Sequence, residues 1–340
     1  MRDLLVAGGG PAGLATALYA ARSGLDVEVW EPRGEVIDKA CGEGLMPGAV
    51  SAFEELGLPL AGQPLLGIRY LSSTHQAEAR FASGPGRGVR RTTLHAALRA
   101  AAVDAGVDIL QRSVKGVTQD DEQVIADGTR ARYLVAADGL HSPVRRTLGL
   151  DGRLAAVRRY GLRCHVETQP WTSFVEVHWS RSCEAYVTPV APGLVGVAVL
   201  TKVRSAFVEQ ISAFPVLAER MAGHPTGAVR GAGPLHRRTK SRVAGRVLLV
   251  GDASGYVDAL TGEGIALALA QARAAVAAVS VGRPQEYERS WQQITWRYRV
   301  LTSALVTSTR VPAVRRGLVP AAGALPAVFS AAVNQLARPA

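Results

Sequence analysis

The chain has few cysteines, and their number and spacing exclude two kinds of small scaffold. Cys41, Cys164 and Cys183 are odd in number and show neither a CxxC pair nor paired-histidine spacing. We therefore expect no disulfide framework and no metal site, a pattern typical of a reducing compartment. The sequence also lacks internal repeats and low-complexity blocks, which excludes solenoids and extended disorder. A globular protein long enough for two domains remains.

Acidic residues are outnumbered, with 28 Asp and Glu against 39 Lys and Arg, which leaves a net charge of +11. This excess raises the question of a nucleic-acid partner. The basic residues are mostly scattered arginines, however, and no basic stripe alternates with aromatics, which form only 6% of the chain. We expect no nucleic-acid partner and attribute the charge to attraction for anionic cofactors or lipid headgroups.

The N-terminal end lacks the pattern of a signal peptide, because an apolar strand-like run begins almost at Met1. We therefore expect a cytoplasmic protein, with association to a membrane as the alternative. Residues 317–337 carry no charge and are long enough to span a bilayer, but Pro320 and Pro326 make them a poor span. We favour a C-terminal helical flap that packs on the body or makes peripheral contact with a membrane surface.

What the chain does have is a dinucleotide fingerprint near its start. A short apolar run, DLLVA, leads into GGGPAG, and a helix-like segment and the strand-like LDVEVWE follow. Gly8, Gly10 and Gly13 fit GxGxxG within a complete βαβ pattern. Glu31 ends the second strand, where a carboxylate accepts ribose hydroxyls, and this favours FAD or NAD over NADP. The neighbouring residues that we predict to share this site are Pro11, Ala12, Pro32 and Arg33.

Two later segments have the same strand-to-loop character and are not required by a plain NAD dehydrogenase. LVAADG ends in Asp138 and Gly139. RVLLVGD ends in Gly251 and Asp252, and a glycine-rich loop and a long Ala/Leu helix follow it.

Together the three motifs resemble the FAD-dependent monooxygenase superfamily, which has the para-hydroxybenzoate hydroxylase fold. The resemblance implies that Asp252 holds a ribityl hydroxyl and that the helix near Gly264 and Ile265 points its positive end at the flavin pyrimidine edge. It also implies that Asp138 and Gly139 lie near the pyrophosphate. Further predicted cofactor residues are Ala40, Cys41, Gly42, Arg91, Val117, Gly251 and Gly262.

Within this superfamily, KACGEGLMPGAV and DALTGEGIALALAQA resemble the geranylgeranyl reductase-type branch. That branch also carries an aromatic residue three positions before a proline on a substrate-domain strand. Tyr186 and Pro189 match this pair and are candidate substrate-pocket residues, although the second aromatic residue of the branch's fuller motif is absent. Cys41 is a candidate catalytic residue, and contact with the cofactor is favoured over a redox or proton-relay role.

The predicted fold class is α/β, with a Rossmann-like FAD-binding domain of the PHBH type, an inserted β-sheet substrate domain and C-terminal helices. Period-2 runs between about residues 155 and 235 predict the inserted sheet. The predicted boundaries are 1–65, 85–155 and 240–285 for the FAD-binding domain, 66–84 and 156–239 for the substrate domain, and 286–340 for the C-terminal helical region. His165 and His178 lie in these runs, where half-solvated strand positions are favoured over an acid/base or metal role.

The leading functional hypothesis from the sequence is an NAD(P)H-dependent monooxygenase. NADH or NADPH would reduce FAD as a transient donor, and a flavin hydroperoxide would hydroxylate a hydrophobic aromatic or polyketide-like substrate. The close alternative is a reductase that adds hydride from reduced FAD to an isoprenoid C=C bond, which the CGEGL and TGEGI loops favour. Distant alternatives are a flavin halogenase and a non-catalytic nucleotide-binding protein. The sequence does not indicate the oligomeric state of the protein.

Overall fold

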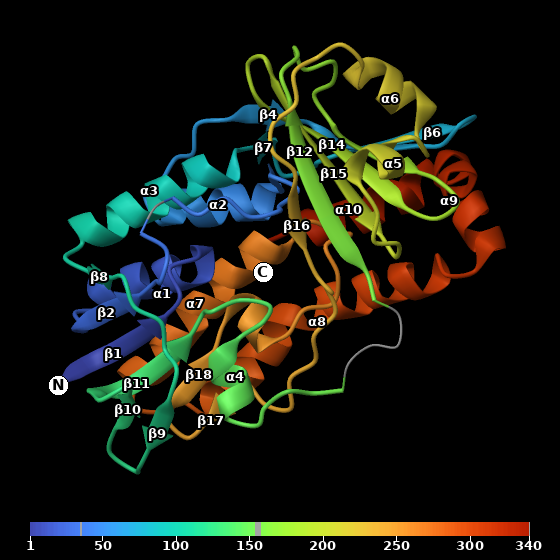
Figure 1. Cartoon of the computed structure of the whole chain (residues 1–340). Helices are drawn as coiled ribbons and strands as arrows, with labels where there is room; N and C mark the ends of the chain where they lie inside the picture. The colour runs from blue at the N-terminus through green and yellow to red at the C-terminus, as the bar shows by residue number, and fades with distance from the viewer. Residues whose placement is uncertain (35, 154–157, 340) are drawn as a thin grey trace.

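The protein is described from a computed structural model, which places residues 1–34, 36–153 and 158–339. A mostly parallel sheet, with antiparallel pairs at β17–β18 and in the β9–β10–β11 segment, forms the core of the part that should bind the cofactor (Figure 1). Its path order is β17-β18-β11-β1-β2-β8, with a β9–β10 hairpin attached to β11. The strands are β1 (Arg2–Ala7), β2 (Val27–Trp30), β8 (Asp108–Leu110), β9 (Val117–Gln119), β10 (Val124–Ala126), β11 (Thr129–Ala136), β17 (Val243–Ala244) and β18 (Val247–Leu249).

Both faces of this sheet are covered, and this explains why β1 reads as a continuous apolar run rather than an alternating one. Leu4 and Val6 pack with the helices on one face, whereas Leu5 and Ala7 pack with Trp30 on the other. The covering helices are α1 (Pro11–Arg22), α2 (Pro47–Glu55), α3 (Arg91–Asp104) and α7 (Gly264–Ser280) on the first face, with the short α4 (Pro143–Thr147) on the second.

A second sheet has the order β16-β12-β15-β14-β13-β5-β6 and is antiparallel except between β13 and β5. Its outer face is a valine-rich cluster beneath the two short helices α5 (Phe207–Ile211) and α6 (Pro215–Met221), and its inner face is turned to the rest of the molecule. The strands are β5 (Gly67–Leu71), β6 (Gln76–Arg80), β12 (Tyr160–Val166), β13 (Val175–Trp179), β14 (Glu184–Ala191), β15 (Leu194–Thr201) and β16 (Arg230–Ala232).

A third sheet has three strands, in the order β3 (Gly44–Leu45), β7 (Gly86–Gly88) and β4 (Gln63–Leu65). In the sequence, β3 and β4 come between β2 and β5, and β7 comes between β6 and β8. This sheet packs closely against β14, since a Cβ on Gly88 would lie 1.7 Å from the Pro189 carbonyl oxygen. This contact fixes the glycine-rich loop that precedes β3 against the second sheet.

The chain ends in α8 (Glu286–Ser308), α9 (Pro312–Ala324) and α10 (Pro326–Ala337). Phe329 and Val333 of α10 pack on β6, and Asn334 accepts a hydrogen bond from the Ala82 amide at 2.7 Å. Among the described helices, none is long and apolar enough by itself to cross a membrane; α9 and α10 reach that length and composition only as a pair bent by 103°.

These observations confirm the predicted fold class. Four of the predicted domain boundaries fall between elements, and α8 begins at the predicted residue, Glu286. The boundary at 155/156 lies outside the described residues. The division into domains stays a prediction.

Candidate functional site

The turn after β1 leaves open space at the start of α1. Gly8 has φ +104°, and a Cβ there would lie 2.6 Å from the Ala137 carbonyl oxygen. A Cβ on Gly13 would lie 1.8 Å from the Gly8 carbonyl oxygen, so α1 packs directly on the turn. At Gly10, in contrast, nothing lies within 4 Å of a Cβ. The free amides and positive end of α1, which begins with Pro11 and Ala12, therefore face a space suited to a pyrophosphate.

Glu31 lies beside this turn as an ionised acceptor. Its Oε2 accepts a hydrogen bond from the Gly9 amide at 2.8 Å, and its Oε1 accepts one from Arg33 Nε at 2.7 Å. Burial pushes the pKa of Glu31 upward, but hydrogen bonds from Arg33 and Gly9 outweigh it, so the pKa is lowered. Pro32 and Arg33 are exposed next to it. A charged carboxylate in this place can accept ribose hydroxyls.

His95 is a residue of this region that the sequence analysis missed. The Ile37 amide lies 3.4 Å from its Nδ1, and its Nε2 lies 2.8 Å from the Gly9 carbonyl oxygen. An amide can only donate and a carbonyl can only accept, so Nδ1 is bare and Nε2 carries the proton. Burial lowers the pKa of His95, which favours this neutral form. His95 thus connects α3 to the Gly8–Gly13 turn through its hydrogen bond to Gly9.

The second motif lies against the first. Asp138 follows β11, and its Oδ2 accepts a hydrogen bond from the Val144 amide at 3.1 Å. Its Oδ1 is buried and has no hydrogen-bond partner in the part of the chain that the structure describes. Gly139 has φ +84°, and a Cβ there would lie 3.6 Å from Lys39 Nζ. The structure therefore brings Asp138 and Gly139 to the loop that follows Glu31.

Three charged side chains surround the next part of the cleft: Lys39, Arg91 and Asp252. Arg91, which is 6% exposed, has a buried Nη1 without a hydrogen-bond partner among the described residues. Burial raises the pKa of Asp252, although Lys39 and Arg91 oppose that shift. The Asp252 side chain is nevertheless exposed. A side chain that is deep in the molecule and yet exposed lines a cleft, and these groups fit phosphate oxygens and a polyol chain.

The loop with Cys41 meets the loop before α7. Gly42 is exposed, and its carbonyl oxygen accepts a hydrogen bond from Thr188 Oγ1 at 2.8 Å, which ties the loop to β14. Met46 lies 3.7 Å from a Cβ built on Gly262. Cys41 and Ala40 are partly buried, and burial raises the pKa of the Cys41 thiol. A neutral thiol supports a contact role over nucleophilic chemistry.

We expect Cys41→Ala to retain FAD and to change kcat by less than about threefold, because a neutral thiol supplies contact area rather than charge. Flavin content after desalting and steady-state rates check this. Cys183→Ala, at a buried cysteine of β14's amino end, serves as the control for loss of a thiol. Colourless Cys41→Ala protein beside yellow Cys183→Ala protein would contradict the expectation.

The loop Gly262–Glu263 leads into α7, which begins at Gly264 and Ile265. Gly262 is exposed, and both Gly264 and Ile265 are partly buried, so the start of α7 is open toward the cleft. Glu263 Oε2 is buried and finds no hydrogen-bond partner within residues 1–34, 36–153 and 158–339, and burial raises the pKa of Glu263 to about 8. The positive end of α7 would stabilise negative charge on a group that lies against it.

The raised pKa of Glu263 leads us to predict that the free energy of unfolding depends on pH. The folded pKa of this side chain, about 8, lies above the ordinary value of 4.5, so the folded state holds the proton and loses stability as pH rises across that window. We expect Glu263→Gln to equal the wild type near pH 4.5 and, counting half of the shift, to be more stable by about 2 kcal/mol at pH 9. Urea unfolding of the apoprotein at several pH values measures this. The exposed Glu209→Gln is the control; parallel curves for wild type and Glu263→Gln would contradict the expectation.

Tyr186 stands on the inner face of the second sheet. It pairs with Ala198 and Val177, and its Oη donates a hydrogen bond to the Leu260 carbonyl oxygen at 3.1 Å. Burial raises the pKa of Tyr186 well above its ordinary value, so the phenol stays neutral. Tyr70 and Trp179 share this face, with their rings 5.4 Å apart. Together these three side chains form an aromatic wall on the inner face of the sheet, which is turned toward the loop that contains Leu260.

Pro189 lies differently. It pairs with Val195, a member of the outer-face cluster, so its side chain alternates away from Tyr186. Thr188, which the sequence analysis missed, shares the inner face and bonds to the Cys41 loop. The substrate-pocket role of Pro189 stays a prediction that the register does not favour.

Val117 begins β9 at the far side of the first sheet. It packs against the cluster that contains Leu5 and Trp30, on the face opposite α1. The cofactor role of Val117 stays a prediction. Gly251, in contrast, lies beside α1, because a Cβ there would be 2.8 Å from Ala12 Cβ.

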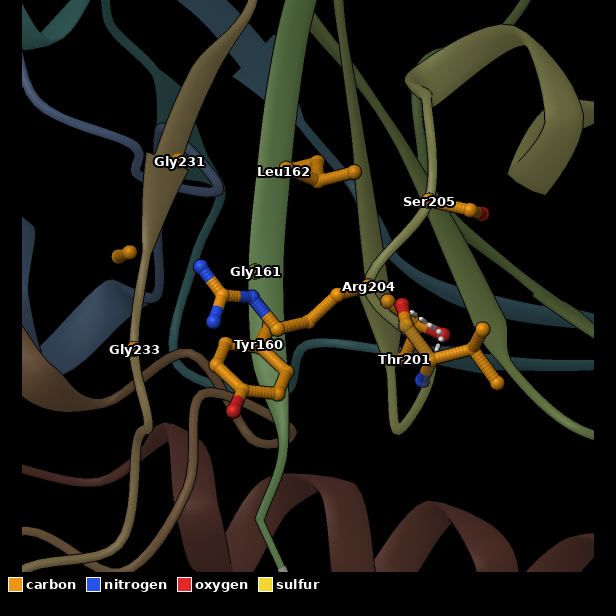
Figure 2. A pocket seen from close by; sticks show the side chains of 10 residues that line it. Tyr160, Gly161, Leu162, Thr201, Arg204, Ser205, Gly231 and Gly233 are labelled. Atoms are coloured by element: carbon orange, nitrogen blue, oxygen red, sulfur yellow. Dashed lines mark hydrogen bonds between the residues drawn. The ribbon is translucent and has the colours of Figure 1, made fainter.

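A groove of about 460 Å³ lies elsewhere, between β12, β16 and the segment after β15 (Figure 2). Tyr160, Leu162 and Arg204 line it, and Arg204 lies over the Tyr160 ring. Tyr160 and Leu162 alternate with Arg163, so the groove is on the opposite face of β12 from the cofactor loops. It therefore has no part in the site described above.

His165 corrects an expectation from the sequence. It is 7% exposed rather than half-solvated, and its Nε2 lies 2.6 Å from Glu43 Oε2. His178 is half-buried on the outer face, 3.2 Å from Glu176. Both faces of this sheet are covered, so alternation of polar residues does not mark a solvent face here. No cluster of metal-ligating side chains occurs within residues 1–34, 36–153 and 158–339.

The sequence profile of a family described as FAD binding domain matches residues 1–280. The chain belongs to this family, and it is an FAD-dependent oxidoreductase. The open cradle at Gly10, the unpartnered Nη1 of Arg91 and the exposed, deeply set Asp252 fit that cofactor.

Curated relatives match most of the chain. A menaquinone reductase of Mycolicibacterium smegmatis is 29% identical, over 85% of this chain and 79% of its own length. A digeranylgeranylglycerophospholipid reductase of Methanopyrus kandleri is 28% identical, over 78% of this chain and 77% of its own length.

Solved structures share the fold. A geranylgeranyl bacteriochlorophyll reductase-like protein of Thermoplasma acidophilum superposes with a TM-score of 0.79 at 20% identity, over 98% of this chain and 95% of its own. The flavin-dependent brominase Bmp2 gives the same TM-score at 19% identity, over 99% of this chain and 93% of its own. Fold likeness alone therefore does not separate the reactions.

Proposed function

We propose that this protein is an FAD-dependent reductase that saturates an isoprenoid C=C bond of a lipid or prenylated quinone. The observation that carries the proposal is that two curated relatives, which match most of this chain, have the same kind of activity. Both are reductases, and both act on molecules that bear isoprenoid chains. This favours the reductase over the hydroxylase, which the sequence analysis placed first.

The inner face of the second sheet supports a hydrophobic substrate. Ile68, Val177 and Leu200 join the aromatic wall of Tyr70, Trp179 and Tyr186 there, and Leu260 closes the cluster from the cofactor side. An isoprenoid chain would bury its methyl and methylene groups against such a surface at about 25 cal/mol per Å². A surface of this kind also keeps water from the reacting carbon atoms.

The cofactor residues have separate tasks in this proposal. Gly10 and Arg91 would hold the pyrophosphate, Glu31 the ribose and Asp252 the ribityl chain. Bound FAD supplies the hydride, with NADH or NADPH as its proposed reductant. The start of α7 would favour negative charge on the pyrimidine edge of the ring, and the Cys41 loop would cover the ring from the side of the second sheet.

A lipid substrate also gives a role to the C-terminal helices. Val311, Val314, Leu325 and Val328 are exposed apolar side chains on α9, α10 and the residues next to them. Arg310 and Arg316 are exposed basic residues in the same region. We propose that this region touches the membrane surface peripherally, where its charge would attract anionic headgroups.

The experiment that tests the proposed reaction is anaerobic reoxidation. The flavin is reduced with one equivalent of dithionite in sealed cuvettes, a geranylgeranyl lipid without a quinone ring is added, and the flavin absorbance is followed. The reductase reoxidises with the substrate and without oxygen. A flavin that stays reduced until oxygen enters, and then forms product, would contradict the proposal and restore the hydroxylase.

A further inference from the structure

A chain of charged side chains joins the cofactor loops to the second sheet. Asp38 contacts Arg163 on β12, and Arg163 Nη1 lies 3.0 Å from His165 Nδ1. His165 Nε2 then lies 2.6 Å from Glu43 Oε2. Arg163 is 1% exposed and Glu43 is 4% exposed, so the middle of this series of charged side chains has little contact with water. Buried charges are costly unless they are paired or hydrogen-bonded, and here Arg163 contacts Asp38 and Glu43 contacts His165.

The partners determine which atom carries the histidine proton. A guanidinium group can only donate, so His165 Nδ1 is bare and accepts from Arg163. The proton of the neutral ring is then on Nε2, which donates to Glu43. The other oxygen of Glu43, Oε1, accepts a hydrogen bond from the Arg91 amide at 2.8 Å. One carboxylate therefore holds a strand of the second sheet and the first residue of α3.

Glu43 needs these contacts because its backbone is strained. Its φ is +59°, in the left-handed region that a residue with a Cβ adopts at a cost of roughly 1–2 kcal/mol. Its carbonyl oxygen accepts from the Val89 amide at 2.9 Å, and its own amide donates to Cys41 Sγ at 3.4 Å. Arg90, the residue that precedes α3, makes no capping hydrogen bond with its side chain. Glu43 supplies that cap from a distant loop.

We propose that Glu43 is a positioning residue for FAD and that His165, on the substrate sheet, holds Glu43 in place. Glu43 contacts Cys41 and the start of the helix that presents Arg91, and both belong to the cofactor cleft. Without the pair, the Cys41 loop and the Arg91 side chain would no longer be held in one arrangement toward the flavin and the pyrophosphate. The adenosine end would lie at Glu31, whose hydrogen bonds among the described residues go to Gly9 and Arg33 and not to Glu43. The proposal rests on FAD binding and is independent of the substrate.

The same sheet offers a matched control. Glu176 and His178 form a second histidine–carboxylate pair, on the outer face of β13. Glu176 is 2% exposed and also bonds to Arg69 and Trp171. None of these contacts reaches the Cys41 loop. Substitution of His178 therefore carries the structural cost of breaking a buried pair without the proposed effect on the cofactor.

The experiment titrates FAD into apoprotein of the wild type, Glu43→Gln, His165→Asn, the double variant and His178→Asn. Quenching of flavin fluorescence gives Kd for FAD, and competition by adenosine, which has no phosphate, gives Kd for the adenosine end. We expect either single variant to weaken FAD by about tenfold to a hundredfold. The double variant should be no worse than the worse single one, since both remove one interaction. Adenosine affinity, and FAD affinity of His178→Asn, should stay within about twofold.

His165→Gln is the rescue variant, because its amide can still donate to Glu43, and it should recover part of the lost FAD affinity. It also keeps the test open if Glu43→Gln does not fold. FAD affinity within twofold of the wild type in folded His165→Asn would overturn the proposal. An equal loss of FAD and adenosine affinity, matched by His178→Asn, would overturn it as well and assign the pair a merely structural role. Because no substrate is present, neither outcome bears on the proposed reduction.

Discussion

Gly10→Val should yield a folded protein without flavin. Gly10 has φ −74° and ψ −178°, an extended conformation that valine adopts readily, and nothing lies within 4 Å of a Cβ there. The apoprotein should therefore keep its stability within about 0.5 kcal/mol. The same open space is where a pyrophosphate would meet the α1 amides, so the valine methyl groups should weaken FAD by at least about a hundredfold, or about 2.7 kcal/mol.

Flavin absorbance after desalting and thermal unfolding of the apoprotein measure the two effects. Gly13→Val is the contrast, since a Cβ there would lie 1.8 Å from the Gly8 carbonyl oxygen. That variant should lose both flavin and stability. Full flavin content in Gly10→Val would show that the cradle at α1 does not hold the cofactor.

Arg91→Met should weaken FAD and at the same time leave the apoprotein no less stable. Arg91 is buried and makes no salt bridge among the described residues, and burial lowers the pKa of its guanidinium. A buried charge without a close partner costs stability, so an apolar side chain of similar length should stabilise the apoprotein by about 1 kcal/mol. A guanidinium bond to phosphate is worth about 1.5–3 kcal/mol, so FAD should bind about tenfold to a hundredfold more weakly.

This prediction is specific because Arg91→Met should lower the affinity for FAD and raise the stability of the apoprotein. A residue kept for stability would lose stability when replaced, whereas one kept for the cofactor loses affinity alone. Arg99→Met, two turns further along α3 at a partly buried position, should change neither quantity by more than about 0.5 kcal/mol. Lower apoprotein stability with unchanged FAD affinity would contradict the assignment of Arg91 to the cofactor.

The parts of the site that could be predicted from sequence are those that depend on local backbone geometry. Gly8 and Gly13 are required by contacts within one strand–turn–helix unit, so their spacing alone indicates the turn. Glu31 follows from the same unit. Asp138 and Asp252 each end a buried strand, and parallel strands bring their carboxyl ends to one edge of a sheet.

The parts that could not be predicted depend on contacts between distant segments. Glu43 and His165 are 122 positions apart and meet only because β12 lies against the Cys41 loop. His95 is one turn beyond Arg91 on α3, but its contact with Gly9 needs the packing of α3 on α1. Thr188 was within reach of sequence reasoning, since residues two apart on a strand share a face, and Thr188 follows Tyr186 by two.

The reaction itself was less accessible to sequence reasoning than the cofactor. Flavin binding depends on short motifs that can be recognised in the sequence. Enzymes that reduce and enzymes that hydroxylate share this fold, and they differ in which substrates fit against the inner face of the second sheet. A reductase-like protein and a brominase superpose on this chain equally well. The curated relatives, not the architecture, favour reduction.

The mass of the product tests the central claim most directly. The holoenzyme, with NADH or NADPH regenerated, is incubated in air with a geranylgeranyl lipid that has no quinone ring, and the extract is analysed by mass spectrometry. The proposed reductase predicts a product heavier than the substrate by two hydrogen atoms, with no oxygen added. A product heavier by one oxygen atom would contradict the account and identify the protein as a monooxygenase.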